Sequence, residues 1–321
     1  MITLGYHSSH EQFAPSLLLE FVQRAEAAGF GAAMCSDHFH PWSEAQGESG
    51  FAWSWLAAAL QSTELPFGVV CAPGYRYHPA IIAQAAATLV EMYPARFWMA
   101  AGSGERLNEH ITGEAWPPKQ ERNERLRECV DVMRALWDGE LVTHRGHVQV
   151  EEARLYTRAD APPPVLGAAL SEETAEWAGG WADGLITASA PIEKLQRVID
   201  AFRRGGGDGK PVLLQVKLSY AKTDAAALEG AHRQWRTVVF DSDVLAELRM
   251  PAEFDAASRL VKPEEMHAFV HVSSDLERHT DWIRQYADLG FDALYLHNVH
   301  DDQQRFIDDF GEHVLPAFTS V

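Results

Sequence analysis

Two stretches far apart in the chain follow one pattern: residues 25–37 are AEAAGFGAAMCSD and residues 286–298 are YADLGFDALYLHN. In each, a segment of helical character meets a glycine, then a phenylalanine, then an apolar run that ends in polar residues. A glycine in that place is a common helix stop, and the short apolar run beyond it is typical of a buried strand. Residues 176–189, EWAGGWADGLITAS, are a looser copy. Repeated helix-to-strand units predict parallel strands, because parallel neighbours need a crossover connection.

The rest of the chain alternates between strand-like and helix-like segments. Eight strands are predicted, over residues 2–8, 32–39, 67–72, 97–104, 165–170, 185–189, 212–220 and 293–298. Helices are predicted between them, over residues 17–28, 51–61, 119–137, 172–180 and 192–204, from Pro79 onward, up to Leu289, and from Asp301 onward. Eight such units predict an α/β fold of the (β/α)8 TIM-barrel type.

We therefore expect one barrel domain over residues 1–321, with insertions at about 139–160 and 224–266, the later one helical. A doubly wound open sheet is the alternative architecture. Its dinucleotide-binding form is disfavoured, because no GxGxxG motif follows the first predicted strand.

The composition excludes several classes of partner. Lys and Arg number 27 against 46 Asp and Glu, so the formal net charge is −19. Nucleic acid and anionic membrane surfaces both attract cationic proteins, so neither is an expected partner. No apolar run approaches the ~20 residues that span a bilayer, and no signal-peptide pattern is visible. The three cysteines form no CxxC pair, which favours reduced thiols and a cytoplasmic location.

Reactive side chains gather where the predicted strands end. In a TIM barrel the active site forms at the carboxyl ends of the strands. The predicted ends carry His7 and Glu11, Asp37-His38-Phe39-His40-Pro41-Trp42, Cys71-Ala72-Pro73-Gly74, Ser103-Gly104-Glu105 with Asn108, Leu170-Ser171, and His297-Asn298. This placement predicts a catalytic site at one rim of the barrel.

Local sequence leaves more than one interpretation for each candidate. His38 beside Asp37 could act as a general base, because histidine titrates near physiological pH, or it could be a hydrogen-bonded structural residue. His38 and His40 alternate along the chain and could bind a metal together. Glu105 could face a cavity, or it could be a first-turn glutamate favoured by a helix dipole. Ser171 could begin a phosphate-binding helix, or it could be an ordinary N-cap.

One run is specific enough to suggest a family. Residues 36–42, SDHFHPW, resemble the Ser-Asp-His-Phe-x-Pro-Trp segment of bacterial-luciferase-like flavin oxidoreductases, in particular the glucose-6-phosphate dehydrogenases that depend on the deazaflavin coenzyme F420. Further matches follow in order at residues 11–15 (EQFAP), 76–80 (RYHPA), 83–84 (AQ), 102–105 (GSGE), 107–109 (LNE), 181–184 (WADG), 288–291 (DLGF) and 314–316 (VLP). The resemblance spans nearly the whole chain. It implies a (β/α)8 barrel, usually a homodimer, that binds FMN or a deazaflavin and a small-molecule substrate.

The resemblance also implies roles for single residues. His38 matches the family's catalytic base, Glu105 its second acid/base and Trp42 its substrate-stacking residue. Glu11 and His40 are expected on the substrate side. The residues expected to bind the cofactor are Asp37, Val70, Cys71, Ala72, Ser103, Asn108, Ala169, Leu170 and Ser171. A non-proline cis peptide is expected at about Val70–Cys71, and no metal ligand set is expected.

Three departures from that subgroup bear on the cofactor and the substrate. Leu170-Ser171-Glu172 stands where the sugar-phosphate enzymes have two glycines and a proline. Pro191 lies near the place of a phosphate-binding lysine, and the loop after the third strand is one residue shorter. Because added carboxylates suit a polyanionic deazaflavin tail poorly, FMN is the expected cofactor, with coenzyme F420 as the alternative. A phosphosugar substrate is not expected.

The expected activity is hydride transfer between this cofactor and a small organic substrate. Three other functions stay open: an FMN-dependent monooxygenase that uses reduced flavin and O2, a flavin-binding barrel without catalysis, and a metal-dependent hydrolase built on Asp37, His38 and His40. The last is disfavoured because the sequence offers no matching distal pair of histidines.

Overall fold

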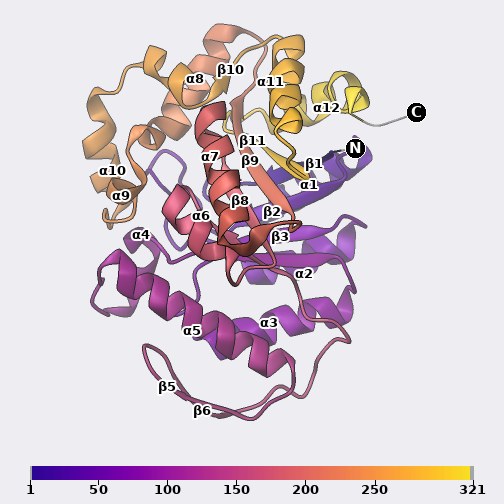
Figure 1. Ribbon diagram of the computed structural model, residues 1–321. Coiled ribbons are helices and arrows are strands. Elements are labelled where there is room, and N and C mark those ends of the chain that lie inside the picture. Colours follow the sequence, from indigo (N-terminus) through magenta and orange to yellow (C-terminus); the bar gives the residue numbers. More distant parts are fainter. Residues whose placement is uncertain (1, 319–321) are drawn as a thin grey trace.

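Parallel strands close into a barrel in the middle of the molecule (Figure 1). The structure, a computed structural model, describes residues 2–318. Within these residues eight parallel strands pair in the order β9-β11-β1-β2-β3-β4-β7-β8, and β8 pairs back onto β9. In chain order they are β1 (Thr3–Ser8), β2 (Ala32–Ser36), β3 (Phe67–Cys71), β4 (Phe97–Ala101), β7 (Val165–Ala168), β8 (Gly184–Ala188), β9 (Val212–Ser219) and β11 (Ala293–Asn298). The predicted eight-stranded α/β barrel is confirmed.

Helices form the outer layer and bury one apolar face each against the strands. They are α1 (Pro15–Ala27), α2 (Ala52–Ser62), α3 (Pro79–Met92), α5 (Lys119–Trp137), α6 (Glu172–Gly179), α7 (Ile192–Phe202), α11 (Leu276–Asp288) and α12 (Gln303–His313). Proline begins both α1 and α3, where its missing N–H costs nothing. In the described part of the chain, no helix combines the length and the apolar character needed to cross a membrane.

Two segments extend the barrel. An antiparallel hairpin of β5 (Val142–Arg145) and β6 (Gln149–Ala153) follows α5. The longer segment holds α8 (Asp224–Trp235), α9 (Ser242–Leu245) and α10 (Pro251–Ala257), and the short strand β10 (His271–Val272) then pairs with β9. In Figure 1 its helices stand at the upper left, beside one end of the barrel. The longer segment has its own apolar cluster, which includes Ala227, Ala231, Trp235 and Met266.

Two strands end three residues earlier than the sequence predicts. The strand predicted over residues 32–39 stops at Ser36, because the backbone N–H groups of Phe39 and His40 donate to the side chain of Asn108 instead of to a strand. The strand predicted over residues 97–104 stops at Ala101. There Gly104 adopts φ of +81°, a left-handed conformation that glycine tolerates and that turns the chain.

Two glycines face two aromatic rings inside the barrel. The rings of Trp98 and Tyr295 lie 5.6 Å apart, between centroids, in the barrel interior. A Cβ atom on Gly68 would lie 1.9 Å from the Trp98 ring, and one on Gly5 would lie 2.5 Å from the Tyr295 ring. The two large rings therefore fit only because the facing strand positions have no side chain.

We expect Gly68→Ala to lower the free energy of unfolding by about 1–3 kcal/mol, because the added methyl group overlaps the Trp98 ring in a packed interior. Gly31→Ala is the matched control, since its new Cβ would lie 3.5 Å from the nearest atom, on Thr3, which is ordinary contact. Urea unfolding followed by far-UV circular dichroism measures both. Equal stability of the two variants would contradict this description of the interior.

Candidate active site

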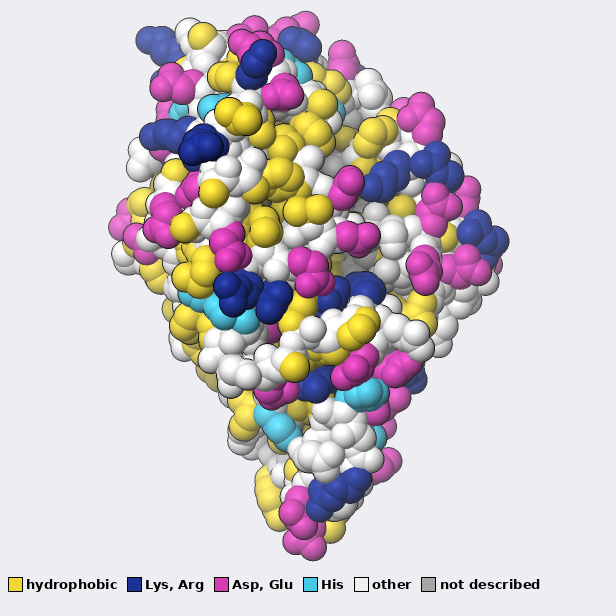
Figure 2. Space-filling view, turned by 90° about the vertical axis from the view of Figure 1, so that its left-hand side faces the viewer, with side chains coloured by type: hydrophobic (Ala, Val, Ile, Leu, Met, Phe, Trp, Pro, Cys, Tyr) yellow, Lys and Arg dark blue, Asp and Glu magenta, His cyan; other side chains and the backbone are white. Residues whose placement is uncertain are grey.

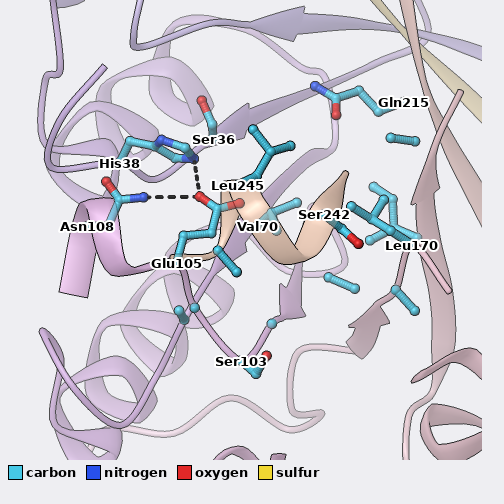
Figure 3. Close-up of a pocket in the computed structure, with 18 of the residues that line it drawn as sticks. Ser36, His38, Val70, Ser103, Glu105, Asn108, Leu170, Gln215, Ser242 and Leu245 are labelled. Carbon is cyan, nitrogen blue, oxygen red and sulfur yellow. Dashed lines mark hydrogen bonds and ion pairs between the residues drawn. The ribbon is translucent and has the colours of Figure 1, made fainter. Parts of the chain in front are cut away.

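A cavity of about 360 Å³ opens at the carboxyl ends of the barrel strands. Figure 3 shows its lining, with side chains from several strand ends pointing into one space. The sequence-predicted residues that line it are Glu11, Asp37, His38, Trp42, Val70, Cys71, Ala72, Ser103, Glu105, Asn108, Ala169, Leu170 and Ser171. The fold thus brings together all of the predicted site residues except His40.

His38 lies between two carboxylates. Its Nδ1 is 3.5 Å from Oε1 of Glu11, and its Nε2 is 3.8 Å from Oε2 of Glu105. Glu11 is buried below the imidazole, whereas the Glu105 side chain is 34% exposed and borders the cavity. Figure 3 shows Glu105 between His38 and Asn108, with contacts to both. An imidazole in this arrangement can take up a proton on the cavity side while a carboxylate stabilises the resulting cation.

The two carboxyl groups have opposite pKa shifts. Burial alone would raise the pKa of Glu11, but His38 and the hydroxyl of Ser36, which donates to Glu11 at 2.7 Å, outweigh it and hold that pKa below its usual value. Burial raises the pKa of Glu105. The charges of His38 and Lys217 lower this pKa, but less than burial raises it. Relative to an ordinary glutamate, the surroundings therefore favour the anion at Glu11 and the protonated form at Glu105.

Asn108 and Trp42 hold this group in place. The Oδ1 atom of Asn108 accepts hydrogen bonds from the backbone of Phe39 and His40 at 2.9 and 3.3 Å, and its Nδ2 donates to Glu105 at 3.4 Å. The rings of Trp42 and His38 lie 5.1 Å apart, between centroids. Asn108 thus ties the loop after β2 to the loop after β4, and Trp42 provides an aromatic side to the cavity next to the imidazole.

His40 lies outside the cavity. Its Nδ1 is 2.8 Å from the carbonyl oxygen of Leu107, and its ring stacks on His110 at 5.5 Å. The expectation that His38 and His40 face the same way required a strand through both residues, and β2 ends before them. The structure does not place His40 on the substrate side. Among residues 2–318, no group of three His, Cys, Asp or Glu side chains could hold a metal ion.

The carboxylate of Asp37 is occupied by contacts with other side chains of the protein. Its carboxylate accepts from the Tyr77 hydroxyl at 2.9 Å and from Nε1 of Trp53 at 3.3 Å, and it lies 3.5 Å from the Arg76 guanidinium. Arg76 also pairs with Glu109 at 3.6 Å, and all three charged side chains are nearly fully buried. Asp37 borders the cavity, but its main contacts join the loop after β2 to the loop after β3 and to α2, and Arg76 extends this link to Glu109 after β4.

The wall formed by the end of β3 differs from the expectation in one respect. Every peptide bond that the structure describes is trans, including the one between Val70 and Cys71. The strand remains in register with β4 up to the pair Cys71–Ala101, so the backbone stays extended there. Val70, Cys71 and Ala72 nevertheless line the cavity with small side chains.

The structure adds cationic and polar residues that the sequence analysis missed. Lys119, at the first position of α5, donates to the Ser103 hydroxyl at 2.6 Å. Ser171 is the N-cap of α6 and accepts from the backbone of Thr174. His7, which the sequence analysis placed at a strand end without a role, also lines the cavity. Further lining residues absent from the prediction include Ser36, Arg122, Thr187, Gln215, Lys217, Trp235, Val238, Asp243, Leu245 and Ala246. No local sequence pattern marks these lysines as cavity residues.

The longer inserted segment forms one side of the cavity. The backbone N–H of Arg106 donates to the carbonyl of Ala246 at 3.0 Å, and Glu247 pairs with Arg122 at 3.0 Å. Leu245 and Val238 contribute apolar lining beside them. Figure 2 shows apolar side chains gathered on the upper part of this face of the molecule, with basic and acidic side chains mixed below.

Comparison with known proteins places the chain in a family. Residues 1–293 match the model of the luciferase-like monooxygenase family, and the chain belongs to that family. It is 37% identical over 335 residues to an F420-dependent glucose-6-phosphate dehydrogenase of Intrasporangium calvum, with full coverage of both chains. It is 35% identical to the enzyme of that name from Mycobacterium tuberculosis, covering 98% of this chain and 97% of the relative.

Solved structures agree with the fold. An F420-dependent secondary alcohol dehydrogenase in complex with an F420-acetone adduct superposes with a TM-score of 0.91 at 31% identity, over the whole of both chains. The F420-dependent tetrahydromethanopterin reductase from Methanopyrus kandleri has a TM-score of 0.79 at 19% identity, which supports the fold alone. The chain is thus an oxidoreductase of the luciferase-like family, and the relatives named above at 31–37% identity are F420-dependent.

We expect Arg76→Met to lower the free energy of unfolding by about 3–5 kcal/mol, because it leaves two buried carboxylates without their cation. Burial already raises the pKa of Glu109 to about 7, against the opposing effect of Arg76. A carboxyl group whose pKa is higher in the folded state stabilises less as pH rises through that pKa. Removal of Arg76 should raise the pKa of Glu109 further, so the added cost of ionising this buried group appears mainly above pH 7. The loss of stability should therefore be larger at pH 8 than at pH 6.

Urea unfolding at the two pH values measures this effect. Arg24→Met is the control, since Arg24 pairs with Asp308 at the surface and both side chains are about half exposed. That variant should lose no more than about 1 kcal/mol, with little dependence on pH. A similar small loss for Arg76→Met would contradict the structural role given to its ion pairs.

Proposed function

We propose that this protein is an F420-dependent dehydrogenase that oxidises a small alcohol, or reduces the matching carbonyl compound. The observation that carries the proposal is His38, held between Glu11 and Glu105 on the wall of a cavity large enough for a ring and a small molecule. Two relatives that the chain matches over its whole length are an F420-dependent glucose-6-phosphate dehydrogenase and an F420-dependent secondary alcohol dehydrogenase, which supports the same reaction class.

The cavity offers a fitting environment for a deazaflavin. Small side chains at the ends of β3 and β7, including Val70, Cys71, Ala168 and the following Ala169, leave room for a planar ring on one side. Ser103, Lys119, Ser171 and Thr174 line the same cavity with hydroxyl groups, an ammonium group and the N-terminus of α6. Such donors suit the phosphate of a cofactor tail.

The structure weakens the reason for which FMN was expected. That expectation relied on the carboxylates after β7 facing the cofactor, and in the described lining neither Glu172 nor Glu173 is present. Glu172 pairs instead with Arg197 at 2.8 Å on the outer surface. We therefore propose coenzyme F420 rather than FMN.

When bound, the deazaflavin ring supplies a hydride acceptor. His38 would take the hydroxyl proton of the alcohol on Nε2, and the fixed negative charge of Glu11 beside Nδ1 would stabilise the imidazolium. Glu105, with its raised pKa, would hold a hydrogen bond to the substrate oxygen next to His38. Trp42 would cover the substrate carbon atoms and keep water from the reacting centre.

We expect His38→Gln to lower kcat for alcohol oxidation by about 10²–10⁴-fold, because the side chain keeps its polarity but loses the proton acceptor. F420 affinity, measured by titration of its absorbance, should change by less than ~3-fold, since ring binding does not require a base. His40→Gln tests the neighbouring histidine of the same motif and should stay within ~3-fold of wild type in kcat. A loss from His40→Gln as large as that from His38→Gln would contradict the assignment.

We expect the protein to bind F420 at least ~10-fold more tightly than FMN, because the polyanionic tail of F420 offers more charge-assisted contacts than the single phosphate of FMN, and each such contact is worth about 1.5–3 kcal/mol. Calorimetric titration of both cofactors measures the ratio. Lys119→Met should weaken F420 binding by about 10-fold, whereas Lys262→Met, which removes an exposed lysine outside the cavity, should not. Tighter binding of FMN, with oxygen consumption by the reduced complex, would support a monooxygenase instead.

A further inference from the structure

Lys217 is a lysine on the inner wall of the barrel. Residues that point inward along β9 alternate, with Leu213 in the apolar interior and then Gln215 and Lys217 on the cavity. The backbone N–H of Lys217 donates to the Ser189 hydroxyl at 3.0 Å, and Lys217 lies opposite His297 in the register with β11. The side chain therefore starts from a fixed strand position.

The ammonium group of Lys217 has no partner. The other two cations of the cavity are engaged, Arg122 with Glu247 at 3.0 Å and Lys119 with Ser103 at 2.6 Å. Within residues 2–318, Lys217 forms neither a side-chain hydrogen bond nor an ion pair. Burial lowers the pKa of Lys217 to about 8, and the nearby charge of Glu105 only partly restores it. A partly desolvated cation without a partner gains free energy when an anion joins it.

The location of Lys217 separates it from the proposed cofactor donors. Around the closed barrel, β9 is four strands from β3 in either direction, so the two strands face each other across the cavity. The hydroxyl and ammonium groups suited to a phosphorylated tail follow β4 and β7, at Ser103, Lys119 and Ser171. An anion at Lys217 would therefore lie on the side away from the β3 wall.

We propose that Lys217 binds an anionic group, a carboxylate or a phosphate, carried by the substrate, so that the substrate is a small anionic alcohol. This inference rests on the proposed function and names the class of alcohol. Thr187 and Gln215 line the same side of the barrel and provide further polar groups, while Trp235 and Val238 would contact the carbon chain. The reacting hydroxyl would face His38, and the anion would face Lys217.

Binding of matched pairs of small molecules tests the proposal without turnover. The probes are 3-hydroxybutyrate against butane-1,3-diol, and glycerol 3-phosphate against glycerol, titrated calorimetrically into the protein alone and into the protein saturated with F420. We expect at least one anion to bind ~10–100-fold more tightly than its neutral partner, the value of one charge-assisted hydrogen bond. Preference for the carboxylate or for the phosphate identifies which anion the site takes.

Three variants assign the preference to Lys217. Lys217→Met should abolish the difference between anion and neutral probe, and Lys217→Arg should retain most of it. Lys194→Met is the control, because Lys194 is exposed, lies outside the cavity lining and yet lowers the pKa of Lys217 by its charge. The control should keep the wild-type preference. Circular dichroism and the F420 affinity of each variant establish that it folds.

Two results would overturn the proposal. One is wild-type protein that binds neither anion more tightly than its neutral partner, and this result needs no variant. The other is a preference that survives in Lys217→Met. Because these measurements record binding, their failure is distinct from a failure of the dehydrogenase proposal, which would appear as full turnover in His38→Gln or as no affinity for F420.

Discussion

The closed ring of parallel strands is the constraint on which the site depends. Because all eight barrel strands within residues 2–318 run in one direction, their carboxyl ends meet at one rim, and side chains distant in sequence converge there. Closure also narrows the interior, so that Trp98 and Tyr295 can fill it only opposite Gly68 and Gly5. The same geometry that packs the interior with rings leaves an open cavity one layer above it.

In this acidic protein, the charged groups at the rim are controlled by their immediate neighbours and not by the net charge of the chain. The formal charge is −19, yet the buried carboxylates at the rim each have a defined role. Asp37 and Glu109 share Arg76, which joins three loops. Glu11 is held as an anion beneath His38, whereas the pKa of Glu105 is raised on the cavity side. Acid/base chemistry at one histidine follows from this asymmetry between two carboxyl groups.

Much of the fold and of the site could be predicted from the chain. Apolar periodicity and glycine stops located the strands to within a few residues, and α5 agrees with its prediction at both ends. Strand ends were overestimated where Asn108 captures the backbone after β2, because that contact joins residues 69 positions apart. His40 was misplaced for the same reason, and Lys119 and Lys217 were missed because no local pattern marks a lysine as facing a cavity.

The sequence by itself determined the parallel barrel, the rim on which chemistry would occur and the identity of His38 and Glu105 as candidates, since these depend on periodicity and on contiguous motifs. Only the tertiary structure decided that Asp37 is tied to Arg76, that His40 turns away, and that the inserted segment forms one side of the cavity. It also decided that Lys217 faces the cavity without a partner. These features depend on which distant side chains meet, and that is settled by barrel closure and packing rather than by neighbours in the chain.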